Sequence, residues 1–485
     1  MGQALMPRTL FTADFDMKNE KSINLIKAVI IIAAAVLILF GIDRVFLLKS
    51  EDGISQLEAL NKQKENTVDV IFLGSSHVYC DISTGVLWDN YGIASFDLGG
   101  AEAPAWVSYY HLKEALKNQN PALVCYEISV ASLYPTLYQS DSWAADNNYG
   151  MSISSDRFWQ LKANSEEQDL KKRIFPISVM HGRYSDLTEN DFRDKNNSIN
   201  YKGYDPRERV TPLGDYEGCP ETAENTPCSE KAEEYIRKII ELCRENNVEL
   251  MFFVSPYKEG QEEKAMYNYI DAIADEYDVE HIDFNSLVDE MGIDFNTDMH
   301  DYTHLNFWGN YKFSDSFGKI IKEGYNVPDR RGDENFASWE VDSKRQRVER
   351  VSNELYYSQT DPVLFMNNLV SEGFDVFVTI KEGVDAGLSE DLSAALENIG
   401  VPKDKQLSGA SYILRDNTII AELSGGFRAS FKEGNTTLLF LEEGEGDYYH
   451  TVSLFKDDDE YKEDYANNIF VYDYVNGSFI ESISF

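Results

Sequence analysis

Short apolar runs alternate with amphipathic stretches along residues 66–325, and this alternation predicts a parallel sheet covered by helices. The runs lie at residues 68–73, 93–98, 122–129, 248–255 and 279–284. Helical periodicity follows several of them, as at residues 228–246, 261–277 and 307–323. Strands that alternate with helices form parallel sheets that are buried on both faces. We therefore expect an α/β domain with a three-layer parallel sheet, and a ligand site at the carboxyl ends of its strands.

Residues 130–226 interrupt this alternation with an aromatic, polar and turn-rich insertion. An insertion of this length is typical of a lid or of a subdomain that shapes a substrate site, and a purely structural decoration is the alternative. The charged stretch at residues 326–354 predicts a linker between the α/β domain and the rest of the chain.

Residues 355–485 predict a second, smaller domain that is either α+β or a β-sandwich. Residues 374–380 have the pattern of a strand, and residues 388–400 have that of an amphipathic helix ended by a glycine. The pair Asn476-Gly477 lies between the last two apolar runs and predicts a type I′ hairpin turn. We find no catalytic constellation in this domain.

Residues 23–45 are apolar enough to predict a transmembrane anchor, since a span needs about 20 residues. A cleaved signal peptide is the alternative, but no small-x-small cleavage site follows the stretch. The lysines that precede it favour a cytoplasmic tail at residues 1–22. We expect a helical neck at residues 46–65, and we expect all that follows to lie outside the cytoplasm.

The net charge and the cysteine content limit the partners and metals that the chain is expected to bind. The chain has 485 residues and a formal net charge of −40, which argues against binding of nucleic acid or of an anionic membrane by the folded part, because both need basic patches. Five cysteines form no zinc framework, and we predict no metal and no cofactor. Cys219 and Cys228 flank a polar loop, where they either pair in a disulfide or stay free.

The first expected strand ends on Gly74-Ser75-Ser76-His77, which makes Ser76 a candidate nucleophile at a strand end. An ordinary strand-to-helix turn is the alternative. A serine attacks a carbonyl only when a base takes its proton and a third group orients that base. His77 is a poor base for Ser76, because neighbouring side chains at a strand end diverge.

Asp301 and His304 lie three residues apart in a loop before the last expected helix of the α/β domain. This spacing lets the carboxylate turn back onto the Nδ1 atom of the imidazole, so that the other nitrogen can face Ser76. We therefore predict Asp301 as the orienting acid and His304 as the base.

Three other interpretations of this loop stay open. His300 and Asp298 form a competing pair, and His300 with His304 has a spacing that can chelate a metal. In the structural alternative the loop is only a polar helix cap, with Asn306 as the N-cap residue.

A tetrahedral oxyanion needs donors that are already in place. The backbone N–H of Ser76 is one candidate. The second expected strand ends in Leu98-Gly99-Gly100, and the bare backbone of Gly99 can approach a substrate closely. We expect the amides of Ser76 and Gly99 to face the oxyanion.

These motifs resemble the SGNH/GDSL hydrolase superfamily over roughly residues 66–324. They are Gly74-Ser75-Ser76 after the first strand, Leu98-Gly99-Gly100 after the second, and the late pair Asp301 and His304. The likeness is greatest to the membrane-anchored, extracytoplasmic branch. That branch includes the alginate O-acetylation proteins and the D-alanine transfer protein of teichoic-acid modification.

The resemblance implies a flavodoxin-like parallel sheet, with Ser76 as nucleophile and Gly99 as the glycine of the second block. It implies that Asp301 and His304 are the paired acid and base. One departure concerns the third block, where the superfamily has an Asn that completes the oxyanion hole. After the third strand this chain reads "YEISVASLYP", in which Glu127 and Ser129 stand but no Asn does.

The C-terminal domain resembles the interleukin-like EMT inducer (ILEI) domain. The resemblance lies in a strand followed by an amphipathic helix at residues 374–401, and in the closing pattern "VYDYVNGSFIESISF". It implies a compact sandwich that binds a ligand such as carbohydrate and does not catalyse a reaction.

We therefore expect a membrane-anchored esterase or O-acyltransferase that acts on acyl esters of an envelope polysaccharide through an acyl-serine intermediate. The expected partners are the polysaccharide or an acyl donor, a membrane acyltransferase, and the lipid bilayer around residues 23–45. The alternative is an inactive SGNH-like scaffold whose C-terminal domain binds surface glycans, and the missing Asn favours it.

Overall fold

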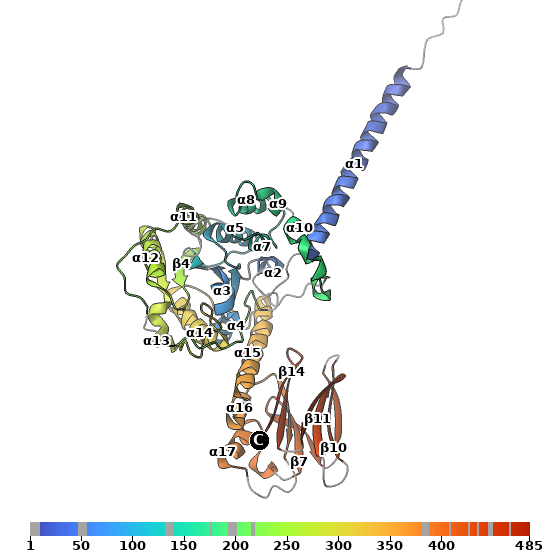
Figure 1. Ribbon diagram of the computed structural model, residues 1–485, viewed down its shortest axis with the longest axis vertical. Coiled ribbons are helices and arrows are strands. Elements are labelled where there is room, and N and C mark those ends of the chain that lie inside the picture. Colours follow the sequence, from blue (N-terminus) through green and yellow to red (C-terminus); the bar gives the residue numbers. More distant parts are fainter. Residues whose placement is uncertain are drawn as a thin grey trace, which may run out of the picture.

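The computed structural model describes residues 10–46, 56–130, 139–174, 177–192, 201–214, 219–380, 388–406, 409–424, 427–433, 436–444, 450–464 and 467–485. Within these ranges the chain forms a long N-terminal helix, an α/β unit and a unit of antiparallel sheets (Figure 1). Helix α1 leaves the α/β unit on one side, and the antiparallel unit lies at the opposite end of the molecule.

The α/β unit contains a five-stranded sheet in the order β2-β1-β3-β4-β5, and every pairing in it is parallel. This confirms the parallel α/β sheet that the alternating pattern predicts. The strands are β1 (Val70–Gly74), β2 (Ser95–Gly99), β3 (Leu123–Glu127), β4 (Glu249–Val254) and β5 (Glu280–Asp283). The strand order reverses between β1 and β3, because β2 lies on one side of β1 and the next strand along the chain, β3, lies on the other side. Such a switch point opens a crevice at the carboxyl ends of the strands.

Two pairs of helices cover the sheet. Helices α5 (Ala105–Ala115) and α11 (Glu230–Glu245) contact each other, as do α4 (Thr84–Tyr91) and α14 (Phe307–Gly324). Figure 1 shows the two pairs on opposite sides of β4. Helix α12 (Gln261–Glu276) packs against β5 at the edge of the sheet.

Under α14 the core is a cluster of buried aromatic rings. The Phe317 ring lies 5.2 Å from that of Phe72 on β1 and 5.0 Å from that of Phe253 on β4, between ring centroids. Phe284 is 4.7 Å from Phe317 on the same measure. Because α14 follows directly on the loop of Asp301 and His304, this cluster fixes that loop relative to the sheet.

The insertion forms short helices. They are α7 (Asp141–Asp146), α8 (Ser155–Ala163), α9 (Leu170–Arg173), α10 (Ile177–Met180) and the 3₁₀ turns η1 (His181–Ser185) and η2 (Glu189–Phe192). Helix α8 packs against α5, and α10, η1 and η2 pack against α1. Residues 201–214 begin beside the edge strand β2, where the Asp97 N–H donates to the Lys202 carbonyl over 2.9 Å.

The predicted charged linker is largely helical, because α15 spans Ala337–Ser358. One face of α15 is buried and apolar, with residues at helical spacing: Trp339, Val348, Val351 and Leu355. Charged residues between them make this pattern hard to recognise in the sequence. The Trp339 indole N–H donates to the Ser95 carbonyl over 3.0 Å.

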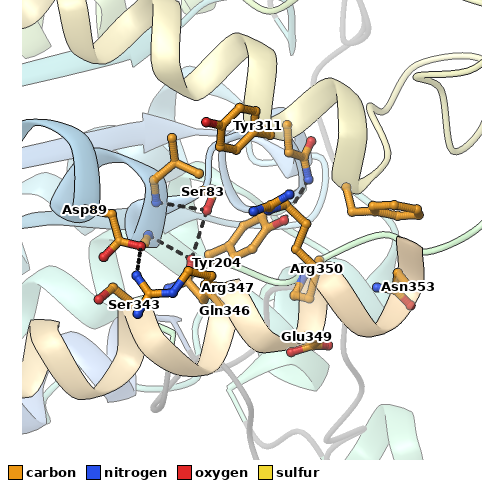
Figure 2. Close-up of a pocket in the computed structure, with 15 residues that line it drawn as sticks. Ser83, Asp89, Tyr204, Tyr311, Ser343, Gln346, Arg347, Glu349, Arg350 and Asn353 are labelled. Atoms are coloured by element: carbon orange, nitrogen blue, oxygen red, sulfur yellow. Dashed lines mark hydrogen bonds and ion pairs between the residues drawn. The ribbon is translucent and has the colours of Figure 1, made fainter. Parts of the chain in front are cut away.

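Polar contacts also fasten α15 onto α4, around a cavity of about 100 Å³ (Figure 2). The Ser83 hydroxyl and the Gly85 N–H donate to Gln346 Oε1 over 3.0 and 2.8 Å. Arg347 and Asp89 form an ion pair of 2.6 Å. The helix therefore docks on the α/β unit through matched polar groups as well as apolar ones.

The C-terminal unit consists of two antiparallel sheets, in the orders β14-β13-β6-β7-β8 and β12-β11-β10-β9. The first sheet contains β6 (Phe374–Thr379), β7 (Ala410–Arg415), β8 (Thr418–Ser424), β13 (Asn468–Asp473) and β14 (Ser478–Ser484). The second contains β9 (Arg428–Glu433), β10 (Thr436–Gly444), β11 (His450–Lys456) and β12 (Asp459–Asp464). One apolar core lies between the sheets, and another lies between the first sheet and helices α15, α16 (Pro362–Asn368) and α17 (Glu390–Asn398).

The predicted type I′ turn at Asn476-Gly477 is wrong. A type I′ turn needs positive φ at both central residues, but only Gly477 has it, with φ 78°. Asp473 instead accepts the backbone N–H groups of Val475 and Asn476 over 2.8 and 2.9 Å, and this carboxylate cap sets a longer loop.

Helix α1 (Leu10–Phe46) contains a stretch, Ile23–Phe46, that is long and apolar enough to cross a membrane. Large apolar side chains along that stretch are exposed, as a lipid-facing surface would be. The side of the membrane to which each end belongs stays a prediction.

We expect Phe317→Ala to lower the free energy of unfolding of the α/β unit by about 3–5 kcal/mol, because it leaves a cavity among packed rings. Denaturant unfolding followed by tryptophan fluorescence measures this, since all six tryptophans lie between residues 88 and 339. Tyr356→Ala on the exposed side of α15 is the control and should change stability by less than about 0.5 kcal/mol. Equal losses in the two variants would contradict the packing described.

Candidate active site

Ser76 lies where β1 gives way to helix α3 (Ser76–Asp81). The turn requires a glycine at Gly74, whose φ is 153°, and a Cβ there would come 2.7 Å from the Cβ of Glu127. Ser75 caps the helix by accepting the His77 N–H over 3.4 Å. Ser76 is thus the first helical residue and is half-buried at the carboxyl edge of the sheet.

The structure brings together all three side chains predicted to form the triad. His304 Nε2 lies 2.8 Å from Ser76 Oγ, and His304 Nδ1 lies 3.0 and 3.1 Å from the two carboxylate oxygens of Asp301. A carboxylate accepts hydrogen bonds only, so the Nδ1 atom carries the proton and Nε2 accepts from the serine hydroxyl. This arrangement prepares His304 to take the proton of Ser76.

Asp301 is held in its ionised form. Partial burial raises its pKa, but the hydrogen bond and the charge of His304 outweigh burial, so the net pKa lies well below the usual range. Asp301 Oδ1 also accepts the backbone N–H groups of Thr303 and His304, each over 2.9 Å. The carboxylate therefore shapes the loop and orients the imidazole at the same time.

The loop is closed by backbone contacts and fastened to α3. Met299 and Leu305 form an isolated antiparallel bridge, and the Leu305 N–H donates to Asp81 Oδ1 over 2.9 Å. Asn306 is the N-cap of α14, as the structural interpretation of this loop predicts, and it accepts the N–H groups of Trp308 and Gly309. The cap and the triad coexist, because they use different residues of the loop.

The competing pair His300 and Asp298 does not form. The Asp298 carboxylate instead accepts from the Lys312 ammonium over 2.6 Å and from the Asp294 N–H over 2.8 Å. His77 does not reach Ser76 as a base either. Its ring stands edge-on to that of His304, 5.4 Å between centroids, and burial lowers the pKa of His77 to about 3.

The expected oxyanion residues lie side by side. A Cβ on Gly99 would come 2.5 Å from the Ser75 carbonyl, so β2 can approach this turn only with glycine at that position. The Gly100 N–H donates to the Gly74 carbonyl over 3.1 Å and closes the contact. At the first position of a helix the Ser76 N–H has no acceptor within the helix. Whether these amides hold an oxyanion stays a prediction.

Glu127 is a site residue to which the sequence assigns no role. It is fully buried at the end of β3 and accepts from the Ser75 hydroxyl over 3.0 Å and from the Ser129 N–H over 2.9 Å. Burial raises the pKa of Glu127 from 4.5 to about 7. Glu127 lies close to the position at which the SGNH/GDSL resemblance predicts an Asn. Its hydrogen bond to the Ser75 hydroxyl stabilises the turn that precedes Ser76.

Two polar residues of the insertion also reach the strand ends. The Asn147 side chain lies against Gly100 and donates to the Ala101 carbonyl over 2.8 Å. Arg207 donates to the Cys80 sulfur over 3.0 Å, one residue before Asp81. Their places depend on the path of the insertion, and no motif in the sequence marks them.

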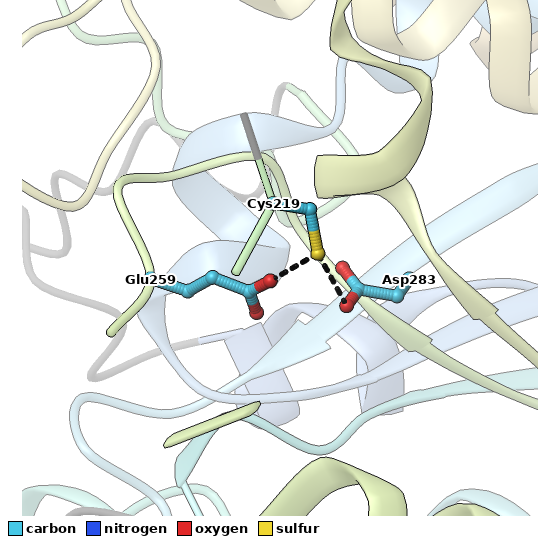
Figure 3. A group of neighbouring side chains, drawn as sticks. All are labelled: Cys219, Glu259 and Asp283. Carbon is cyan, nitrogen blue, oxygen red and sulfur yellow. Dashed lines mark hydrogen bonds between the residues drawn. The ribbon is translucent and has the colours of Figure 1, made fainter. Parts of the chain in front are cut away.

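Cys219, Glu259 and Asp283 form the only group of metal-type ligands found among the described residues, with ligand atoms within 4.8 Å of one another (Figure 3). The Cys219 thiol donates to Glu259 over 2.6 Å, and the Lys264 ammonium pairs with Asp283. Because a proton and an ammonium already offset the negative charge, we assign no metal to it. The predicted disulfide alternative does not form either, since Cys219 and Cys228 are both free.

Comparison with protein-family models and with curated proteins finds no match to this chain. The resemblance to the SGNH/GDSL superfamily is therefore carried by the motifs alone. The function has to be argued from the geometry of the site.

We expect Glu127→Gln to change how stability depends on pH. In the wild type the folded state keeps a proton that the unfolded state loses near pH 4.5, so this stabilisation is full below that pH and is lost as the pH rises through about 7. Relative to the variant, the wild type should lose on the order of 3 kcal/mol between pH 4 and pH 8. Denaturant unfolding at each pH measures it.

The matched control is Glu245→Gln, at an exposed position near the end of α11. Its stability should run parallel to that of the wild type over the same pH range. A difference between the wild type and Glu127→Gln that does not vary with pH would show that Glu127 titrates as an exposed carboxylate.

Proposed function

We propose that this chain is a membrane-anchored serine ester hydrolase or O-acyltransferase of the SGNH type. The observation that carries the proposal is the unbroken chain of hydrogen bonds from Ser76 through His304 to Asp301. The chain has seven histidines. His304 is hydrogen-bonded to the Ser76 hydroxyl through Nε2 and to the Asp301 carboxylate through Nδ1. An ordinary helix cap needs neither contact.

In the proposed reaction His304 Nε2 takes the proton from Ser76 as its Oγ attacks the carbonyl carbon of an acyl ester. Asp301 stabilises the resulting imidazolium, and the amides of Ser76 and Gly99 hold the oxyanion. Collapse of the tetrahedral intermediate breaks the bond to the alcohol, which leaves with the proton from His304. Water or a sugar hydroxyl then attacks the acyl-serine, with His304 again as the base, and this step restores Ser76.

The positions of the motifs in the fold support this class. Gly74-Ser75-Ser76 ends β1, Leu98-Gly99-Gly100 ends β2, and the loop of Asp301 and His304 directly precedes α14. These positions and a sheet order of 2-1-3-4-5 fit a three-layer, flavodoxin-like domain of the SGNH type.

The cellular setting of the proposal rests on α1. Helix α1 as a membrane anchor would place the site in the cell envelope, with an extracytoplasmic α/β unit. Acyl esters of envelope polysaccharide are the substrate class we propose, with a membrane acyltransferase as a candidate source of acyl groups. The acyl group itself is left open.

A second function is favoured by Glu127. The sequence after the third strand lacks the Asn of the superfamily's third block, and the buried carboxyl of Glu127 is bonded to Ser75, so one expected oxyanion donor is missing. In this alternative the α/β unit is an inactive scaffold, and the two antiparallel sheets, which resemble an ILEI domain, bind surface glycans.

We expect a fluorophosphonate probe to label the purified full-length protein at Ser76, because the probe reacts only with an activated serine. His304→Ala should abolish the adduct, while His300→Ala, four residues earlier in the same loop, should keep it. Mass spectrometry of the labelled peptide reads out the result. The absence of an adduct on folded protein would contradict the enzyme proposal. Glycan binding that is unchanged in Ser76→Ala would then support the scaffold alternative.

Asp301→Asn tests the orienting role separately. The Asn oxygen can still accept the N–H groups of Thr303 and His304, but its amide group donates toward Nδ1 and favours the wrong tautomer of His304. We expect the rate of probe labelling, or of hydrolysis of a short-chain acyl ester, to fall by about 10²–10⁴-fold. Circular dichroism like that of the wild type would show that the loop is kept. An unchanged rate would remove Asp301 from the mechanism.

A further inference from the structure

The insertion exposes a cluster of large apolar side chains. They are Ile153, Phe158, Trp159, Ile174, Tyr184 and Phe192, all within 40 residues of sequence. Ile153 is 87% exposed and Phe192 is 67% exposed. Single exposed apolar residues are ordinary on a soluble surface. Here the rings of Phe158 and Trp159 contact each other and Ile153 and Ile174 line one pocket, and exposed apolar side chains gathered in this way are typical of a contact with a partner.

The elements that carry this cluster surround the end of α1. Asp43 accepts the Ile177 N–H over 2.7 Å, and Arg183 donates to the Phe46 carbonyl over 2.7 Å. Figure 1 shows α8, α9 and α10 on the side of the α/β unit from which α1 leaves. The elements that carry the exposed apolar side chains therefore pack beside the C-terminal end of α1.

A pocket of about 340 Å³ joins the two surfaces. One wall contains Val36, Leu39 and Phe40 of α1, and the other contains Ile153 and Ile174 of the insertion. The charged residues Asp43, Arg44, Glu58 and Arg157 also line the pocket. Val36 lies ten residues before Phe46, a rise of about 15 Å along a helix. When α1 spans a bilayer, part of the insertion thus lies at the depth of the span itself.

The segment that carries the cluster is nearly balanced in charge, unlike the chain as a whole, whose net charge is −40: residues 153–192 carry six basic and seven acidic side chains. The Lys162 ammonium lies 4.8 Å from the centre of the Trp159 ring, and both residue types are common where proteins meet lipid headgroups.

We propose that residues 153–174 and 177–192 form a second membrane contact, in the leaflet from which α1 emerges. Ile153, Phe158, Trp159 and Ile174 enter the boundary between headgroups and acyl chains, as the apolar face of an interfacial helix does. The proposal rests on α1 being a span and does not depend on catalytic activity. The α/β unit would then contact the bilayer through both α1 and the insertion.

The test places one fluorophore at a time on the full-length protein in vesicles of phosphatidylcholine and phosphatidylglycerol. Cys219→Ser removes the one cysteine that is not buried, and Leu37→Cys, Ile153→Cys or Ile420→Cys then carries an environment-sensitive label. Ile420 lies on β8, at the opposite end of the molecule from α1, and is the matched control for Ile153. Lipid with a nitroxide near the headgroup end of one acyl chain is the quencher.

We expect quenching several-fold stronger at positions 37 and 153 than at position 420. Strong quenching at 37 with equal, weak quenching at 153 and 420 would overturn the second contact and leave the anchor standing. Weak quenching at all three positions would remove the anchor and the second contact together.

Discussion

A buried hydrogen bond joins the two segments that make the candidate site. The Leu305 N–H donates to Asp81 Oδ1 at the last residue of α3, the helix that begins with Ser76. The loop that carries His304 is therefore fixed to the same helix as Ser76, and this attachment supports the 2.8 Å contact between His304 and Ser76. The aromatic cluster under α14 holds the other end of the loop against the sheet.

Buried carboxyl groups surround the strand ends, and burial raises the pKa of Asp81, Asp97 and Glu127. Burial favours the protonated form of these groups, least strongly for Glu127, whose pKa of about 7 leaves it partly ionised at neutral pH. In the proposed mechanism, protonated carboxyls at these positions would not oppose the negative charge that a tetrahedral intermediate develops. Asp301 differs from them because it is partly exposed and paired with His304, so its charge persists.

Local pattern was enough to predict the five parallel strands and the residues Ser76, Asp301 and His304. The strands depend on short apolar runs, and the pair Asp301 and His304 depends on a spacing of three residues. The contact of Ser76 with His304 spans 228 residues and was predicted from the place of each motif relative to the expected strands and helices. Glu127 and Asn147 could not be predicted in the same way, because their partners Ser75 and Gly100 are 52 and 47 residues away in sequence. The type I′ turn failed because the Asp473 side chain competes with the intrinsic preference of Asn476-Gly477.

Helix α15 determines how far the two ends of the molecule stand apart. Its 22 residues extend over about 33 Å, and its buried contacts with β2 and α4 keep it from swivelling. With α1 in a membrane, the antiparallel sheets would be carried at a set height above the lipid. The helix would then set the distance between the membrane and whatever the antiparallel sheets contact, which a flexible tether could not do.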